Sequence, residues 1–491
     1  MRSSVRNATD LATVKGELLV VCVPAEPSPL AGPAAEADAA LDGAIARSVA
    51  DGEVKGEPGS LTVFHAGPAL RAPRVAVVGV GEGSADDWRA AGRAVASATE
   101  RAPAKRVALV PPPGSGPAEA AAFVEGLGTG LYRFRRFKSG DDEPAPPSRL
   151  MVHHPAVRTA DVERADRVVA AVNGARDLVN TPGNHLTPTM LAAHAERLAA
   201  QTPGLECTVL GRKELEKLGA GALLAVAQGS DEPPRMIVLR YRPETARPGE
   251  VLGLVGKAVT FDSGGISIKP SNGMEEMKMD MGGGAAVIEG TALIAALGLP
   301  VEVLAVVPST ENLPSGRAVK PGDVVTAMNG RTVEVINTDA EGRLILADAL
   351  TYAARQGATR MIDFATLTGA IVVALGEVYA GLFGSDEEWT ATVRAAGEAS
   401  GDLAWPMPMH ERYAPLIEST VADLTNSSNK RQAGPVYAAQ FLREFTEGLP
   451  WCHLDVAGTA MTSAGGTGFG VRLALAVAER LAGAPAPPVR T

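Results

Sequence analysis

Hydrophobic positions along the first third of the chain fall into two alternating kinds of segment. Short runs of aliphatic, often β-branched residues lie at Leu18–Val23, Ser60–Phe64, Arg74–Val78 and Val107–Val110. Runs this short and this apolar are typical of buried strands. Alanine-rich segments with helical spacing lie at residues 35–50, 85–100 and 117–128. Strands that alternate with helices predict an α/β layer.

A second region with the same alternation follows. A helical segment begins near Asp161, and after the turn TPGNHLTP the chain contains six strand-like runs: CTVL, MIVLRY, VLGLVG, VEVLAVV, VEVIN and MIDFATL. The segment Lys138–Leu150, rich in proline and charge, is typical of a linker or surface loop. Because 491 residues exceed what one core usually serves, we predict α/β domains at residues 1–157 and 158–491.

Composition argues against nucleic acid as the main partner. The chain has 46 Lys and Arg against 56 Asp and Glu, a formal charge of -10, so no basic face is implied. The turn Gly79–Ser84 (GVGEGS) lacks the G-x-G-x-x-G spacing of a dinucleotide site and indicates a tight strand-to-helix turn. A module that binds nucleic acid or a nucleotide, through a local basic patch that the total charge hides, is the alternative main role.

Cysteine use and hydropathy predict a cytoplasmic protein. Cys22, Cys207 and Cys452 are scattered, odd in number and without metal or redox spacing, which fits a reducing compartment. The first residues lack the apolar core of a signal peptide. The apolar stretch near residues 285–307 is interrupted by charged residues and by Pro300, so we expect no membrane span.

Charged residues then appear where a buried strand is expected to end. The segment Ile336–Leu344 reads INTDAEGRL and places Asp339, Glu341 and Arg343 at every second position. In extended geometry these three side chains would point to the same side. Two carboxylates so placed repel each other unless a cation lies between them. A solvated strand end with a surface ion pair is the simpler interpretation of an isolated D-x-E-x-R.

More charges occur at apolar, glycine-rich positions upstream. Lys257, Asp262 and Lys269 follow the run VLGLV, and Asp280 lies between two methionines ahead of three glycines. Singly, each fits a surface lysine, a turn or a helix cap. Together with Asp339 and Glu341, they form a plausible two-metal site in which carboxylates bridge divalent ions. Oxygen ligands suit Mg²⁺ or Mn²⁺ and can hold Zn²⁺, whereas the seven histidines show no H-E-x-x-H spacing.

These motifs together resemble the cytosol (leucyl) aminopeptidase family. The similarity covers most of the second half of the chain, and the first half matches weakly through Glu125–Ser139. Two positions depart from the family pattern, Ala258 and the third glycine of Gly282–Gly284, and neither removes a ligand. The matching blocks are VGKAVTFDSGGISIKP, MKMDMGG, NTDAEGRL, NTPGNHLTP, DFATLTGA, AGPVYAAQFLREF, WCHLDVAGTA and TGFGVR.

The resemblance implies a metal-dependent aminopeptidase that acts on peptides with a free N-terminus and prefers a leucine-like first residue. It implies two divalent ions (Mn²⁺, Zn²⁺ or Mg²⁺), with Asp262 and Glu341 bridging them and Asp339 on the more exchangeable one. The implied ligands are Lys257, Asp262, Asp280, Asp339 and Glu341.

Catalytic and fold assignments also follow from the resemblance. Lys269 would stabilise the oxyanion, and Arg343 would hold a bicarbonate that serves as general base. An apolar pocket for the first side chain would contain Met277, Thr366, Gly369 and Ala457, although core packing explains Met277 equally well. The family fold is an N-terminal macro-like α/β domain and a larger α/β catalytic domain with a central mixed sheet, assembled as a homohexamer. Some family members also bind DNA, so the alternative function is a nucleic-acid or nucleotide-binding module with a secondary peptidase activity. A catalytically dead scaffold would require a lost ligand, and none is missing.

Overall fold

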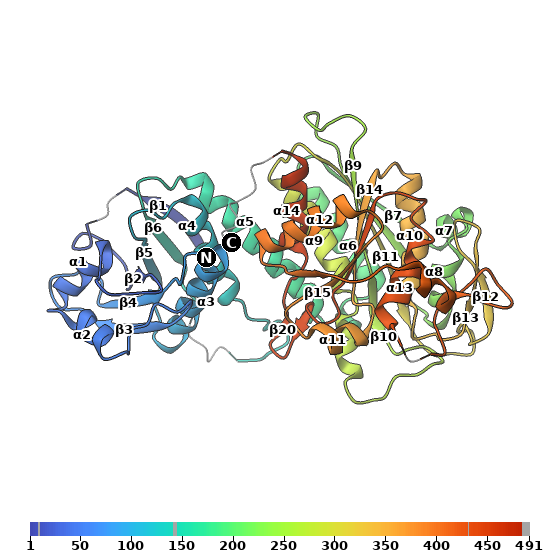
Figure 1. Ribbon diagram of the computed structural model, residues 1–491, viewed down its shortest axis with the longest axis horizontal. Coiled ribbons are helices and arrows are strands. Elements are labelled where there is room, and N and C mark those ends of the chain that lie inside the picture. The colour runs from blue at the N-terminus through green and yellow to red at the C-terminus, as the bar shows by residue number, and fades with distance from the viewer. Residues whose placement is uncertain (8–9, 141–144, 431, 484–491) are drawn as a thin grey trace. The chain divides into compact units, whose positions relative to one another are not determined.

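The computed structural model describes residues 1–7, 10–140, 145–430 and 432–483. The chain folds into two compact units, one up to Asn173 and a larger one from Gly174, so the division falls inside helix α5 (Thr159–Asn180). Each unit contains a mixed sheet with helices (Figure 1), which confirms the predicted α/β fold class. The boundary placed between residues 157 and 158 lies just before α5 and stays a prediction.

The N-terminal unit is built on a six-stranded sheet in the order β1-β6-β5-β2-β4-β3 among the described residues. β3 is antiparallel to β4, and the other neighbours are parallel. The strands are β1 (Arg2–Arg6), β2 (Leu18–Val23), β3 (Leu61–His65), β4 (Arg74–Gly79), β5 (Arg106–Val110) and β6 (Arg149–His153).

Helices cover both faces of this sheet, which explains why its central strands are apolar throughout. In β2, Leu18 and Val20 pack with residues of α3 (Ala85–Arg101) and α4 (Pro117–Gly130). The alternate residues Leu19 and Val21 pack with α1 (Gly32–Ala40) and α2 (Ala44–Ala50). Successive side chains of a strand point to opposite faces, so a strand covered on both sides reads as one continuous hydrophobic run.

Two predictions in this unit are corrected. Residues 35–50 do not form one helix, because Asp42 (φ 54°) and Gly43 (φ 76°) adopt left-handed conformations that end α1 before α2 begins. The segment predicted as a linker, residues 138–150, includes the start of β6, which pairs with both β1 and β5. Residues 141–144 of that segment lie outside the described residues.

The second unit contains a nine-stranded sheet among the described residues, ordered β16-β15-β18-β14-β9-β11-β8-β7, with β10 paired to β11. Its strands are β7 (Leu205–Leu210), β8 (Arg235–Tyr241), β9 (Val251–Gly256), β10 (Ala258–Asp262), β11 (Glu302–Asn312), β14 (Arg360–Ala365), β15 (Ala380–Gly384), β16 (Ala404–Pro406) and β18 (Trp451–Asp455). Two small sheets comprise β12 (Asp323–Thr326), β13 (Thr332–Val335) and β17 (Leu424–Thr425), and β19 (Met461–Thr462) and β20 (Gly465–Gly466).

Helices pack on both faces of the large sheet. The helices of this unit are α6 (Pro188–Gln201), α7 (Arg212–Leu218), α8 (Gly221–Val226), α9 (Gly282–Ala296), α10 (Gly342–Arg355), α11 (Gly369–Leu375), α12 (Glu387–Ser400), α13 (Gly434–Arg443) and α14 (Val471–Leu481), with 3₁₀ turns η1 (Gly183–His185), η2 (Ala227–Gly229), η3 (Met274–Met279) and η4 (Glu411–Ile417). Helices α8, α10 and α13 share one core with the sheet, while α9 packs on β9, β11 and β14 and against α14.

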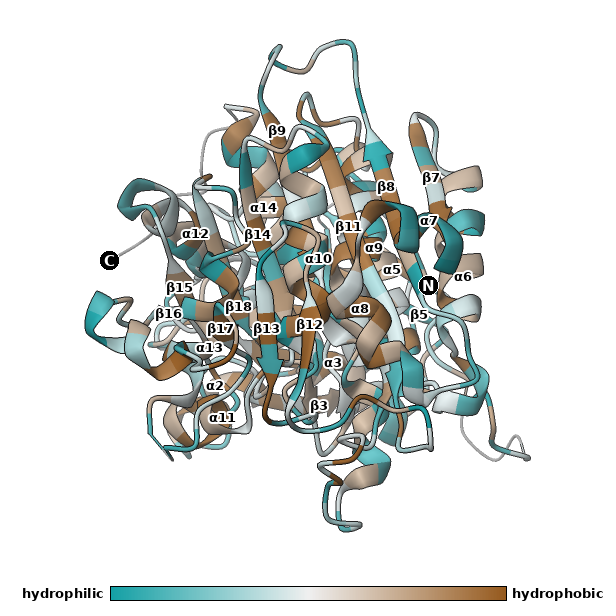
Figure 2. Cartoon of the chain, turned by 90° about the vertical axis from the view of Figure 1, so that its right-hand side faces the viewer, coloured by the Kyte–Doolittle hydropathy of each residue, from teal (hydrophilic) through white to brown (hydrophobic). Residues whose placement is uncertain are grey.

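Hydropathy follows burial in this unit. Strands β9 and β11 are largely hydrophobic, whereas the exposed helix α7 is strongly hydrophilic (Figure 2). In the part of the chain that the structure describes, no helix combines the length and the apolar character needed to cross a membrane.

One edge of the large sheet gathers several strand ends. β10, β11, β9, β14 and β18 are neighbours and run parallel, so their carboxyl ends meet at the same edge. Loops beyond the carboxyl ends of parallel strands are where such sheets place ligands. The strand ends at this edge are Gly256, Asp262, Asn312, Ala365 and Asp455.

Candidate metal centre

The charged residues singled out in the sequence come from several elements at this edge. Lys257 directly follows β9, Asp262 is the last residue of β10, and Asp280 follows the 3₁₀ turn η3. Asp339 lies in the loop after β13, and Glu341 is the N-cap of α10. The site is therefore assembled from segments far apart in sequence.

The extended geometry predicted for Asp339, Glu341 and Arg343 is wrong. β13 ends at Val335, a turn carries Asp339, and Arg343 lies in the first turn of α10. The strand ends early because Ile336 and Asn337 direct their N–H groups to the side chain of Asn426 instead of to a neighbouring strand. Alternation along a strand therefore does not place these residues.

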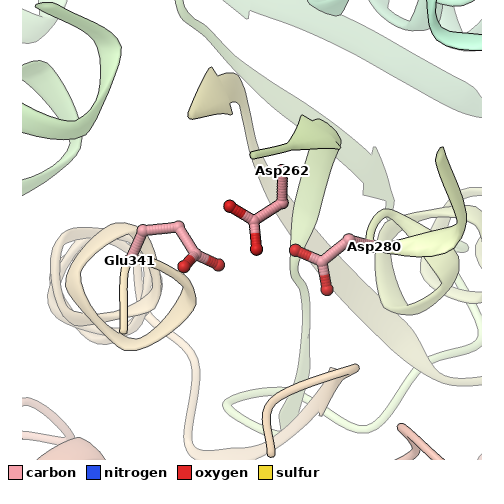
Figure 3. Close-up of side chains that lie close together, drawn as sticks. All are labelled: Asp262, Asp280 and Glu341. Atoms are coloured by element: carbon pink, nitrogen blue, oxygen red, sulfur yellow. The ribbon is translucent and has the colours of Figure 1, made fainter. Parts of the chain in front are cut away.

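Three carboxylates converge at the centre of the site. Asp262, Asp280 and Glu341 point toward one another (Figure 3), each offering an oxygen within 4.8 Å of the others. All three residues are almost inaccessible to solvent, with 2%, 4% and 2% exposure. Three buried carboxylates at this separation require nearby positive charge to remain ionised.

Two lysines supply that charge in the structure. Nζ of Lys257 lies 2.8 Å from Oδ2 of Asp280 and 2.8 Å from Oε1 of Glu341, and it donates to the carbonyl of Thr366 at 2.9 Å. Lys269 pairs with Oδ2 of Asp262 at 2.7 Å and also with Asp339. The two ammonium groups thus neutralise different parts of the cluster.

The pKa values reflect this balance of burial and charge. Burial opposes the charged form of Lys257, but Asp280 and Glu341 outweigh it and raise the pKa of the amine. Burial raises the pKa of Asp280, and burial with the charge of Glu341 raises that of Asp262. For Glu341, burial acts upward, but Lys257 and Lys269 lower its pKa overall. Glu341 is therefore the carboxylate of the three that is held most firmly in its charged form.

The donor set fits divalent cations. Oε2 of Glu341 is buried and has no hydrogen-bond partner among the described residues. Oδ2 of Asp280 and Oδ1 of Asp339 contact a lysine but meet no donor in hydrogen-bonding geometry within the described ranges. Buried carboxylate oxygens normally have partners. Clustered carboxylates with free acceptor capacity are the ligands that Mg²⁺, Mn²⁺ and, in smaller sets, Zn²⁺ accept.

Glycines allow the close packing that builds the site. A Cβ on Gly342 would lie 2.6 Å from Cε of Lys257, so only glycine leaves room for that side chain beside α10. A Cβ on Gly283 would lie 1.9 Å from the carbonyl oxygen of Phe364. The glycine run at the start of α9 therefore serves close approach of the helix to β14.

A cavity of about 340 Å³ opens onto the cluster. The cavity is lined by the five candidate ligands, by Lys269 and by all four residues assigned to the substrate pocket: Met277, Thr366, Gly369 and Ala457. Met274, Met279, Leu367 and Val372 also line it, so much of the wall is apolar.

Arg343 does not line this cavity. Its side chain is buried, Nη1 donates to the carbonyl of Asn426 at 2.9 Å, and Cζ lies 5.3 Å from the ring centroid of Tyr437. It forms no ion pair with Asp339 or Glu341 among the described residues, and its Nε lacks a partner there. Burial lowers the pKa of the guanidinium.

Several residues that position the site were missed in the sequence. Asn312, at the end of β11, donates to Oδ1 of Asp262 at 2.8 Å and to the carbonyl of Thr338 at 3.0 Å. Asp455, at the end of β18, accepts from the hydroxyl of Thr368 at 2.6 Å. Asp455 lies in the WCHLDVAGTA block, and its place at a buried strand end is the one available signal.

Comparisons with known proteins show the family to which the chain belongs. The model of the cytosol aminopeptidase catalytic domain matches residues 173–475, and that of the family's N-terminal domain matches residues 19–141. A "Probable cytosol aminopeptidase" of Solibacter usitatus is 48% identical over 417 residues, covering 84% of this chain and 86% of the relative. Another, from Syntrophotalea carbinolica, is 45% identical and covers 91% and 93%.

Solved structures show the same fold over nearly the whole chain. A mutant of tomato leucine aminopeptidase has a TM-score of 0.89 and 33% identity, covering 97% of this chain and 96% of its own. The bottromycin maturation enzyme BotP in complex with Mn has a TM-score of 0.84 and 35% identity, covering 95% and 99%. The chain belongs to the cytosol aminopeptidase family and is a metallo-exopeptidase.

Proposed function

We propose that this enzyme releases N-terminal residues, preferably hydrophobic and leucine-like ones, from peptides with a free N-terminus. Two divalent cations would be held by Lys257, Asp262, Asp280, Asp339 and Glu341. The observation that carries this proposal is the convergence of buried carboxylates and two lysines at one cavity. Bound divalent cations would supply Lewis acidity and lower the pKa of a water molecule.

The two roles proposed for Lys257 require different protonation states. As an ammonium it compensates Asp280 and Glu341, as its contacts in the structure indicate. Only a neutral amine can act as a ligand, so its role there requires loss of a proton. Neighbouring dications favour that loss because like charge lowers the pKa of an amine.

Lys269 is the proposed electrophile. Burial alone would lower its pKa, but Asp262 and Glu341 outweigh burial and raise it, so this amine stays protonated at neutral pH. It lines the cavity where a scissile carbonyl would lie. A fixed positive charge there stabilises the oxyanion that forms when the carbonyl is attacked.

Arg343 is proposed to hold bicarbonate, which would take the proton from the attacking water. Its Nε is buried without a partner among the described residues, which leaves a donor available to a small anion. A planar guanidinium presents paired donors that match a planar anion.

The apolar wall of the cavity supports a hydrophobic first residue. Met277 and Ala457 contribute apolar surface. A Cβ built on Gly369 would meet no atom within 4 Å, so space is open beside this glycine. The Mn complex of BotP supports Mn²⁺ as one of the candidate metals, beside Zn²⁺ and Mg²⁺.

A reconstitution assay tests this proposal. Chelated protein is loaded with Mn²⁺, Zn²⁺ or Mg²⁺ and assayed against leucine, alanine and glutamate amides and Cys-Gly, with N-acetyl-leucine amide as the blocked control. We expect metal-dependent hydrolysis that is fastest for leucine amide and absent for the blocked substrate. Failure of every metal to restore hydrolysis would contradict the proposal.

A homohexamer in the cytoplasm completes the proposal. The hexamer rests on family resemblance, and the compartment rests on cysteine use and hydropathy. Sedimentation analysis of the purified chain tests the assembly. Nucleic acid is not proposed as the main partner because the chain carries a formal charge of -10.

A further inference from the structure

Asn426 holds the loop between β13 and α10 with every polar atom of its side chain. It lies just after β17 and is fully buried. Its Oδ1 accepts from the N–H groups of Ile336 (3.0 Å) and Asn337 (3.4 Å). Its Nδ2 donates to the carbonyls of Asn337 (2.7 Å) and Ala340 (3.2 Å). We refer to these four bonds as the Asn426 clasp.

The clasp requires an amide. A primary amide offers two donors on nitrogen and two lone pairs on oxygen, and all four are used here. Two N–H groups face the oxygen and two carbonyls face the nitrogen, so the partners themselves fix its orientation. An aspartate of the same shape would set acceptor against acceptor at Asn337 and Ala340.

The main chain of Asn426 extends the same contact in both directions. Its N–H donates to the carbonyl of Glu334 at 3.0 Å, which continues the pairing of β17 with β13. Its carbonyl accepts from Nη1 of Arg343 at 2.9 Å. One buried residue thus joins the end of β13, the loop of residues 336–340 and the guanidinium of Arg343.

Hydrogen bonds of Thr338 fix the opposite side of this loop. Its hydroxyl donates to the carbonyl of Gly264 at 2.6 Å, and its own carbonyl accepts from Asn312, which also contacts Asp262. The loop is therefore fixed at two points. Thr338 links it to Asn312 and so to Asp262, and Asn426 links it to Arg343. Asp339 and Glu341 leave this doubly fixed backbone toward the cavity, which both of them line.

We propose that Asn426 is a positioning residue for the aminopeptidase reaction, which it serves by fixing the backbone that presents Asp339, Glu341 and Arg343. This inference rests on the proposed function of those three residues. Asn426 is not among the residues that line the cavity, and its effect passes through the loop and through Arg343. Misplacement of catalytic groups by about 1 Å can cost about 100-fold in rate.

The test compares Asn426→Ala and Asn426→Asp with Asn329→Ala. Asn329 is a matched control near the opposite end of β13, where its side chain also bonds main-chain groups, of Glu444 at 3.2 Å and Arg331 at 3.1 Å. Hydrogen exchange of the Ile336 and Asn337 amides is measured in chelated protein, and kcat and KM for leucine amide are measured after loading with Mn²⁺.

We expect these two amides to exchange at least about tenfold faster in both Asn426 variants than in wild type. Alanine removes the oxygen that accepts from both amides, and aspartate removes the Nδ2 donor that completes the clasp. Their kcat should fall by about 100-fold with KM nearly unchanged. Asn329→Ala should change neither quantity. If Asn426→Ala does not fold, Asn426→Ser, which keeps a small polar side chain, should change both quantities in the same direction.

A wild-type kcat in Asn426→Ala would overturn the proposal, as would an equal loss in Asn329→Ala. Faster exchange with unchanged kcat would also overturn it, because the loop would then be held without consequence for the reaction. Inactivity of the Mn²⁺-loaded wild type would instead contradict the proposed function, and exchange in chelated protein would still report on the clasp.

Discussion

Nζ of Lys257 lies 2.8 Å from Oδ2 of Asp280, and both groups are buried at the cavity. The amine also lies 2.8 Å from Oε1 of Glu341, so one cation compensates two buried anions. Removing one partner of a buried ion pair costs more than the pair contributes, because the remaining charge stays desolvated.

Lys257→Met should therefore destabilise the chelated protein by about 3–5 kcal/mol. Urea unfolding in the presence of a chelator measures this loss. Lys320→Met is the control, because Lys320 pairs with Asp323 at 2.8 Å on the exposed surface, where solvent screens the interaction. An equally small effect of both substitutions would show that Lys257 does not compensate the cluster.

Lys269→Ala should lower kcat by about 10²–10³-fold with little change in bound metal, because the lysine is proposed to act on charge that develops in the transition state. Its ammonium pairs with Asp262 at 2.7 Å, so bound metal is measured alongside kcat. A loss of activity fully explained by lost metal would assign Lys269 to metal binding instead.

Arg343→Ala should slow turnover and abolish any response to bicarbonate, whereas wild type depleted of bicarbonate should be stimulated when the anion is restored. Arg343 makes no ion pair with Asp339 or Glu341 among the described residues, so its loss should act through the bound anion and not through metal affinity. The measurement is activity in degassed buffer as bicarbonate and metal are titrated separately. Indifference of wild type to bicarbonate, with a variant that merely needs more metal, would make Arg343 structural.

The sequence predicted the strands and helices best where burial alone determines them. Leu18–Val23 and Val251–Gly256 are continuous apolar runs, and both are buried strands in the structure. The single helix predicted at residues 35–50 was wrong because composition does not reveal that Asp42 and Gly43 adopt left-handed conformations. β1 and β6 were missed because β1 is polar and β6 begins inside a charged, proline-rich segment.

The sequence motifs revealed the candidate site, but they did not reveal the side chains that hold its backbone in place. The gathering of Asp262, Asp280 and Glu341 was expected from residue type and family resemblance. The conformation around Asp339 was not, because the backbone there is fixed by a side chain 90 residues after Ile336 in the chain. A lone asparagine in a polar loop gives no sign of such a contact in the sequence.

Asp348 predicts a pH dependence of stability that is separate from the metal centre. Its carboxylate accepts from the N–H groups of Leu223 at 2.8 Å and Met328 at 2.7 Å, yet burial raises its pKa from 3.8 to about 7. Between these values the folded protein holds a proton that the unfolded chain has lost. The contribution of Asp348 to stability should therefore fall as pH rises through this range.

The free energy of unfolding of wild type and Asp348→Asn, measured across this range, tests that sign. We expect the stability of wild type relative to the variant to fall as pH rises. Asp323→Asn is a control of opposite sign at lower pH: hydrogen bonds from Lys320 lower the pKa of Asp323, so its contribution to stability should be lost as pH falls below 3.8. A difference that stays constant across this range would show that the pKa of this carboxyl is not raised, and one that grows in favour of wild type would show that it is lowered.

The most direct measurement is a titration of Mn²⁺ into chelated protein, with bound metal and leucine amide hydrolysis followed together in wild type, Asp262→Asn and Glu341→Gln. An amide at either position would leave positive charge of the bound cations uncompensated. We predict that wild-type activity saturates at about two ions per chain, as expected of a two-metal centre. Both variants should bind fewer ions and show no turnover. Hydrolysis by the metal-free wild type, or a variant with full metal content and the wild-type rate, would contradict the assignment of this cluster as the catalytic metal site.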